Sequence, residues 1–247
     1  MSGAPRVALA GLLLVACGGP EYDLARVPER TEVLLLASVH GRHLDEDLDY
    51  PSEELAALLR AAEPDVIVAE LPPAGEARVR AALAAGEADP WLEAFPELRE
   101  VVFPVAAELE VPVVAGSGWR RAVTEARRAY AAEEPAGPGD PRYRRAAAHL
   151  ARRDAEEDLD PEWMHAAARW RLVAWRDRLL ERFAGEALGP AAPSRRHAEH
   201  AKRLRELVRA HAGERLVVVF DADDLWALAE ALRAMEGVTL LDARGLL

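Results

Sequence analysis

The sequence predicts an α/β fold, with a mostly parallel central sheet, flanking helices and a large helical insertion between the third and fourth strands. Two short apolar runs, at residues 32–38 and 66–69, are separated by a helix of about ten residues. A strand, a helix and a second strand form a βαβ unit, in which the two strands run parallel. Further strand signals occur near the end of the chain, at residues 215–220 and 238–241.

The first helix shows how the pattern sets the element boundaries. Leu55, Leu58 and Leu59 share one helix face after Pro51, and Pro64 ends the helix before the second strand. The remaining predicted elements, in chain order, are helices at 74–85 and 97–108, a strand at 111–115, and a strand, helix and strand at 215–220, 224–235 and 238–241.

Residues 119–212 carry no strand signal. They predict three or four helices, broken at 135–141, near 160–161 and at 189–193. The helix expected from about Pro161 carries Trp163, Trp170 and Trp175, which we interpret as a stripe facing the core. Because strands lie on both sides of this stretch, we expect one domain, at residues 31–247, with the helices inserted over a single sheet.

The N-terminus resembles a bacterial lipoprotein signal. Arg6 precedes an apolar run at residues 7–16, which is too short to span a membrane, and Cys17 follows. Residues 14–17 (LVAC) resemble the lipobox, in which the cysteine receives a diacylglycerol and becomes the new N-terminus. The sequence thus predicts a signal peptide at 1–16, lipid on Cys17, a membrane as partner and a tether at 17–30. A plain secretory peptide with an incidental cysteine, or a buried first strand, is the alternative.

Two further features bear on location and partners. Gly18 stands where an aspartate often signals retention in the inner membrane, so the sequence favours an anchor in the outer membrane of the cell envelope. The formal charge of −12 becomes −13 when residues 1–16 are removed, because Arg6 is lost and no acidic residue is. Such an acidic chain is a poor candidate for binding nucleic acid.

Polar side chains follow three of the predicted strands. His40 and His43 follow the first, Glu70 ends the second, and a cluster of aspartates follows the fourth: Asp221, Asp223 and Asp224. Ligands of open α/β sheets bind beyond the carboxyl ends of the strands. Imidazole and carboxylate groups together suit a divalent metal, which can ionise a bound water near neutral pH.

Glu70 is the most informative of these residues, because it lies in an otherwise apolar run, VIVAEL. A buried carboxylate is costly unless it is paired, hydrogen-bonded or bound to a cation. Two interpretations of Glu70 are open: it forms a salt bridge with an arginine such as Arg78, or it belongs to a functional site.

Other candidate residues carry weaker signals. His197 and His200 could share one helix face and bind a metal, but surface histidines on an arginine-rich helix are the favoured interpretation, as for His149, His165 and His211. Ser117, between two glycines, is a weak candidate nucleophile. The sequence contains no phosphate-binding glycine motif and no G-x-S-x-G elbow.

Two segments resemble a known group of proteins. EVLLLASVHGRH with PDVIVAELPP, and RLVVVFDADDLWALAEAL near the end, resemble the TraB/GumN/TIKI-type proteins and the related erythromycin-esterase-like and ChaN-like domains. The resemblance covers about residues 31–73 and 213–242, and it implies an α/β domain with two GxxH motifs and metal-dependent peptidase activity. His40 matches the first histidine and Glu70 the glutamate. Ala37 and Asp221 stand at the glycine positions, and Asp224 stands where the second histidine is expected.

The resulting hypothesis is a lipid-anchored, metal-dependent hydrolase acting on peptide or ester bonds. His40 and Asp224 would hold the metal, and Glu70 would bind it or act as general base, with His43, Asp221 and Asp223 as additional ligands. The alternative is a catalytically degenerate envelope lipoprotein that binds a ligand or a protein, because the second histidine is replaced. A purely structural envelope protein is a third interpretation.

Overall fold

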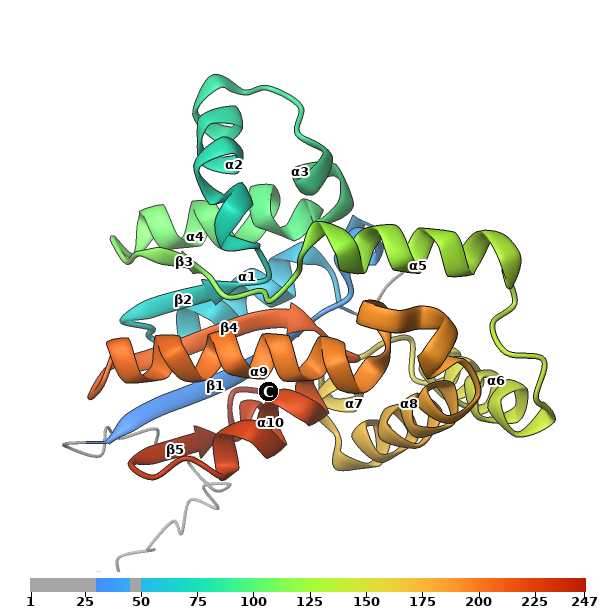
Figure 1. Ribbon diagram of the computed structural model, residues 1–247. Coiled ribbons are helices and arrows are strands. Elements are labelled where there is room, and N and C mark those ends of the chain that lie inside the picture. Colours follow the sequence, from blue (N-terminus) through green and yellow to red (C-terminus); the bar gives the residue numbers. More distant parts are fainter. Residues whose placement is uncertain (1–29, 45–49) are drawn as a thin grey trace, which may run out of the picture.

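The computed structural model describes residues 30–44 and 50–247 (Figure 1). Cys17, the predicted signal peptide and all but the last residue of the predicted tether lie outside these residues. The fold is α/β, as predicted, with one parallel five-stranded sheet in the order β3-β2-β4-β1-β5. The strands are β1 (Thr31–Ser38), β2 (Val66–Ala69), β3 (Val113–Ala115), β4 (Arg215–Asp221) and β5 (Val238–Leu241).

β4 and β1 form the centre of the sheet. All eight residues of β1 are buried, as are the first six of β4, because helices cover both faces. A continuous apolar run such as LLLA, rather than an alternating one, is what such burial requires. β4 inserts between β2 and β1, so the last long strand of the chain lies between the first two.

Before β4 lie α1 (Ser52–Ala61), α2 (Pro73–Ala85), α3 (Pro90–Ala94), α4 (Phe103–Glu108), α5 (Arg121–Glu133), α6 (Pro141–Glu156), α7 (Pro161–His165), α8 (Ala167–Leu188) and α9 (Pro193–Ala210). After it lies α10 (Leu225–Arg233). Helices α1, α2 and α10 lie close to their predicted ranges, whereas α3 was not predicted and residues 119–212 form five α-helices where three or four were expected. Short 3-10 or π turns are η1 (His40–Leu44), η2 (Leu98–Val102), η3 (Gly189–Ala191) and η4 (Ala243–Gly245).

The layers of the fold are visible in Figure 1. α1 and α4 lie behind the sheet and α9 and α10 in front of it, while α6 to α8 gather beyond the carboxyl ends of the strands. Met164 of α7 and Leu204 of α9 belong to the main core, whereas α5, α8 and η3 share a small second cluster around Val123 and Leu188. None of the helices among the described residues is long and apolar enough to cross a membrane.

Two predicted helices differ from the observed ones. The stretch predicted at 97–108 begins with the π turn η2, because Pro104 has no N–H to bond the carbonyl four residues earlier. The helix predicted from Pro161 breaks at Ala166, whose backbone is extended. The tryptophan stripe is therefore wrong in part: Trp163 is buried, but Trp175 is 38 % exposed.

The end of β1 is held by side chains from two other segments. β5 pairs with β1 only as far as Leu34, so it offers no hydrogen-bond partner to Ala37. Instead, Ala37 N–H donates to His165 Nε2 (2.9 Å). On the same residue, the Tyr50 hydroxyl donates to the carbonyl oxygen of Ala37 (2.9 Å). These two contacts fix the direction in which the chain leaves the strand toward His40. The prediction that His165 is a surface histidine is wrong, because it is buried.

Candidate functional site

The carboxyl ends of three neighbouring strands form the candidate site. Because β2, β4 and β1 are adjacent and parallel, Glu70, the Asp221–Asp224 turn and His40 emerge at the same edge of the sheet. Ser38 pairs with Asp221 in the register of β1 and β4, which brings the two following turns side by side. The sequence predicted this convergence from the strand pattern alone.

Glu70 is buried beneath this edge. Its Oε1 accepts a hydrogen bond from Trp119 Nε1 (2.7 Å), and its Oε2 accepts one from the backbone N–H of Asp221 (2.8 Å). Burial, reinforced by the charges of Asp224 and Asp221 and opposed by His40, raises the pKa of Glu70 to about 7. The salt bridge to Arg78 does not form, because Arg78 pairs with Asp89 (Nε to Oδ2, 2.8 Å).

His40 lies at the open side of the site, with its side chain 24 % exposed. Its Nε2 is 3.5 Å from Asp221 Oδ2 and 4.0 Å from Glu70 Oε2, and its Nδ1 is 2.8 Å from Glu97 Oε1. Burial disfavours the protonated ring, but the interactions with Asp221 and Glu97 outweigh it and raise the pKa of His40 to about 11. His40 is therefore a cation at neutral pH.

The backbone of His40 is also unusual. Its φ of 50° lies in the left-handed region, which is uncommon for a residue with a side chain. The surrounding contacts maintain this conformation: His40 N–H donates to Ser38 Oγ (3.1 Å), and the ring packs edge-on against Phe95 (4.5 Å between centroids). Strained backbone of this kind gathers at functional sites, so it supports a role for His40.

Glu97 belongs to the candidate site, although the sequence predicts only that it begins a helix. It is buried, and its Oε1 accepts hydrogen bonds from Ser38 Oγ (2.8 Å) and from His40 Nδ1. Its Oε2 has no hydrogen-bond partner among the residues that the structure describes. Glu97 thus orients the His40 ring so that Nε2 faces Asp221 and Glu70. Nothing in its local sequence distinguishes it from a surface glutamate.

Asp224 lies deeper, at the residue before α10. Its Oδ1 accepts a hydrogen bond from Arg196 Nη2 (2.8 Å) and lies 2.9 Å from His197 Nε2, and its Oδ2 is 3.9 Å from His200 Nε2. Burial alone would raise the pKa of Asp224, but the charge of Arg196 and the contact with His197 lower it well below the ordinary value. Asp224 is an anion that is already paired.

Three buried groups could together hold a metal ion: Glu70, His200 and Asp224. One potential ligand atom from each lies within 4.8 Å of the others. Glu70 and Asp224 belong to the predicted metal site, but His200 stands where the sequence predicts His40. The prediction that His197 and His200 lie on the surface is wrong, because both are buried against Asp224.

A sequence signal for the burial of His200 existed. His200, Leu204 and Leu207 recur at the spacing of one helix face, and all three are buried. The other two histidines predicted at the surface, His211 and His149, are half-buried and lie outside this group. His211 contacts Glu214 (Nδ1 to Oε2, 2.8 Å), and His149 lies beside Arg152.

The hydrogen bonding of His200 constrains its chemistry. The backbone N–H of Gly118 donates to His200 Nδ1 (3.0 Å), so the proton of the neutral ring resides on Nε2, which faces Asp224. Burial lowers the pKa of His200 to about 4, which keeps the ring neutral at pH 7. In this tautomer His200 is a hydrogen-bond donor, and Glu70 and Asp224 supply the lone pairs that a cation requires.

The other candidate residues have different surroundings. Both ring nitrogens of His43 are occupied by backbone groups: Nδ1 donates to Tyr50 O (2.8 Å), and Nε2 accepts from Val39 N–H (3.0 Å). His43 therefore has no nitrogen free for a metal in this structure. Asp223 Oδ1 accepts a hydrogen bond from Arg169 Nη2 (2.8 Å), and its carboxylate also pairs with a second arginine.

Asp221 and Ser117 complete the set of predicted residues. Asp221 is 39 % exposed beside His40, so it forms part of the open side of the site. Ser117 is almost fully buried, and its Oγ accepts a hydrogen bond from Trp119 N–H (3.1 Å). Ser117 thus shapes the turn that carries Trp119 to Glu70, and it does not face solvent as an exposed nucleophile would.

Comparison of the chain with protein-family models, with curated proteins and with solved structures finds no match. The resemblance to the TraB/GumN/TIKI-type proteins thus stays a prediction.

Proposed function

We propose that this protein is a divalent-metal-dependent hydrolase. The observation that carries the proposal is the buried group of Glu70, His200 and Asp224, with ligand atoms within 4.8 Å of one another at the carboxyl ends of the strands. Buried carboxylates are costly without a cation or a full set of hydrogen bonds, and clustered carboxylates raise that cost. A divalent cation between Glu70 and Asp224 would relieve their mutual repulsion.

The donor set favours an ion that prefers oxygen ligands. Glu70 and Asp224 are hard carboxylate ligands, and His200 presents an N–H toward the same space unless it loses its contact with Gly118. Two oxygen ligands with a hydrogen-bonding histidine beside them suit Mg²⁺ or Mn²⁺ better than Zn²⁺. When bound, such an ion polarises a carbonyl and lowers the pKa of a coordinated water.

His40 supplies a proton at the open side of the site. Its Nε2 faces Asp221 and Glu70, and Glu97 holds the ring by Nδ1, so the proton on Nε2 is held beside the half-exposed carboxylate of Asp221. A positioned cationic imidazole can protonate a leaving group or stabilise a developing negative charge. In this proposal His40 acts as a general acid, whereas the sequence predicts it as a metal ligand.

The substrate and the location rest on the sequence. The resemblance of residues 31–73 and 213–242 supports peptide or ester bonds as substrates. The lipobox-like residues 14–17 support lipid on Cys17 and an anchor in the cell envelope, with the outer membrane as destination. The acidic charge supports a partner other than nucleic acid.

A second function is favoured by Arg196. Its guanidinium already neutralises Asp224, as a bound cation would, at an Nη2-to-Oδ1 distance of 2.8 Å. A site whose deeper carboxylate is permanently paired with arginine can recognise a polar ligand or a protein segment at the open side, around His40 and Asp221, without catalysis. Metal binding separates the two functions.

Calorimetric titration of the chelator-treated protein with MnCl₂, and separately with ZnCl₂, tests the metal site. The parent protein is expected to bind one ion, and Glu70→Gln and Asp224→Asn are expected to weaken binding at least tenfold. Glu97→Gln is the matched control, because it changes a buried carboxylate of the same site outside the metal group. Undetectable binding by the parent, or equal binding by all variants, would exclude the hydrolase proposal.

Arg196→Met distinguishes the two functions directly. If a metal competes with Arg196 for Asp224, removing the guanidinium should tighten Mn²⁺ binding. If the site works without metal, the substitution should leave Asp224 as an uncompensated buried charge and lower stability, with no gain in Mn²⁺ affinity. A combined measurement of Mn²⁺ affinity and unfolding midpoint therefore assigns the role of the arginine.

A further inference from the structure

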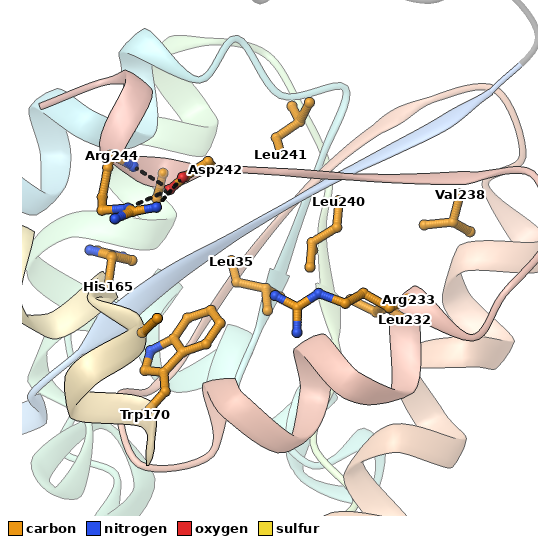
Figure 2. A pocket seen from close by; sticks show the side chains of 12 residues that line it. Leu35, His165, Trp170, Leu232, Arg233, Val238, Leu240, Leu241, Asp242 and Arg244 are labelled. Atoms are coloured by element: carbon orange, nitrogen blue, oxygen red, sulfur yellow. Dashed lines mark hydrogen bonds and ion pairs between the residues drawn. The ribbon is translucent and has the colours of Figure 1, made fainter. Parts of the chain in front are cut away.

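A second concave site lies at the β5 edge of the sheet, apart from the residues described above. A cavity of about 380 Å³ opens between β5, α10 and the junction of α7 and α8 (Figure 2). Its lining shares no residue with the metal group or with the His40 turn. The volume falls in the range of about 300–1,000 Å³ that is typical of small-ligand sites.

One wall of the cavity is apolar. Leu35 of β1, Leu240 of β5 and the ring of Trp170 from α8 form part of it, and all three are labelled in Figure 2. The indole N–H of Trp170 already donates to the carbonyl oxygen of Met164 (3.1 Å), so the ring offers the cavity only its apolar surface. Such a wall suits the hydrocarbon body of a ligand.

The polar part of the lining carries a net positive charge. Arg244 is balanced by Asp242 (Nε to Oδ1, 3.0 Å), whereas no described residue forms an ion pair with Arg233. His165 adds no charge, because both its ring nitrogens contact backbone groups and burial lowers its pKa to about 4. The excess cation is therefore Arg233, in a protein whose overall formal charge is −12.

We propose that this cavity binds a small carboxylate with an apolar body, its carboxylate on Arg233 and its hydrocarbon part between Trp170 and Leu240. Arginine matches a carboxylate in a planar, bidentate geometry, which gives such a contact specificity as well as strength. The half-buried side chains of β5 would lose their remaining exposure to water when the hydrocarbon part enters. The cavity thus provides both the apolar and the cationic complement that this ligand class requires.

Calorimetric titration of the full chain with sodium octanoate tests the charge requirement. Octanoate is expected to bind with a Kd of about 1 mM or tighter. Octylammonium, which has the same chain and the opposite charge, should bind at least tenfold more weakly. Arg233→Gln should weaken octanoate binding about tenfold, while Arg209→Gln, an exposed arginine of α9, should leave it unchanged.

A steric pair tests the location. Ala167 lines the cavity and is exposed, so Ala167→Phe should fill the entrance without disturbing the core, and it should abolish octanoate binding. Ala168→Phe, at the next exposed position outside the lining, is the matched control and should bind like the parent. The proposal is wrong if octanoate shows no binding at about 10 mM, if octylammonium binds equally well, or if the two phenylalanine variants behave alike.

Discussion

His165 should make the stability of this protein fall steeply between pH 6.5 and pH 4. Burial lowers the pKa of His165 to about 4, from 6.5 for an exposed histidine, and it outweighs the hydrogen bond from Nδ1 to the carbonyl oxygen of Pro161, which raises the pKa. As pH falls through this interval, the unfolded chain takes up a proton that the folded protein does not. The difference of about 2.5 pKa units corresponds to about 3 kcal/mol of stability, present above pH 6.5 and lost by about pH 4.

His165→Gln isolates this contribution. Glutamine keeps an acceptor for the Ala37 N–H but does not titrate, so the gap in unfolding free energy between parent and variant should shrink by about 2–3 kcal/mol from pH 7 to pH 4.5. Urea unfolding followed by circular dichroism measures this gap. His200, which titrates similarly, contributes equally to both proteins and cancels. A gap that stays constant with pH would refute the reasoning.

Three further changes have expected outcomes. Gly118→Ala should lower the free energy of unfolding in denaturant by about 1–3 kcal/mol, because the new Cβ would lie 2.4 Å from a backbone carbon of α9. Gly139→Ala is the control and should leave the stability unchanged, because its Cβ would lie 3.8 Å from the nearest atom. Arg215→Met should cost about 3–5 kcal/mol in the same assay, because it removes a buried guanidinium that donates to Glu32 Oε2 (2.8 Å) and to the carbonyl oxygen of Ala62 (3.1 Å). Adding Glu32→Gln should recover much of the loss, because it also removes the buried negative charge. Cys17→Ser should move the protein from the membrane fraction to the soluble fraction on cell fractionation without changing its thermal unfolding, and a variant that stays in the membrane fraction would contradict the lipid anchor.

Much of the fold follows from local patterns. Residues 66–69 and 215–220 are apolar runs too short for helices, and proline ends the helix before the first of them. Parallel strands place their carboxyl ends at one edge of the sheet. The sequence therefore predicts that Glu70, Asp224 and His40 lie near one another at that edge. The predicted helix boundaries differ from the observed ones at two places, the π turn before Pro104 and the break at Ala166, whose backbone is extended.

The partners of the site residues could not be predicted. His200, Arg196 and Glu97 reach the site from α9 and from the segment before η2, and local sequence does not specify which strand end each will meet. The many arginines of α9 predict a surface position for His200, although His200 shares a helix face with the buried Leu204 and Leu207. The roles of the two histidines therefore differ from the predicted ones. His40 pairs with Glu97 and stays protonated, and His200 lies beside the carboxylates of Glu70 and Asp224.

The sequence by itself determined the α/β class, the strand ends at which polar side chains gather and the residue types at those ends, because these depend on periodicity and on parallel-strand geometry. The tertiary structure decided which groups pair, which ring nitrogen carries a proton and where the apolar cavity beside β5 opens. Those properties depend on distances of a few ångströms between segments far apart in the chain, for example between Gly118 and His200. Helix packing sets such distances, and no local pattern records them.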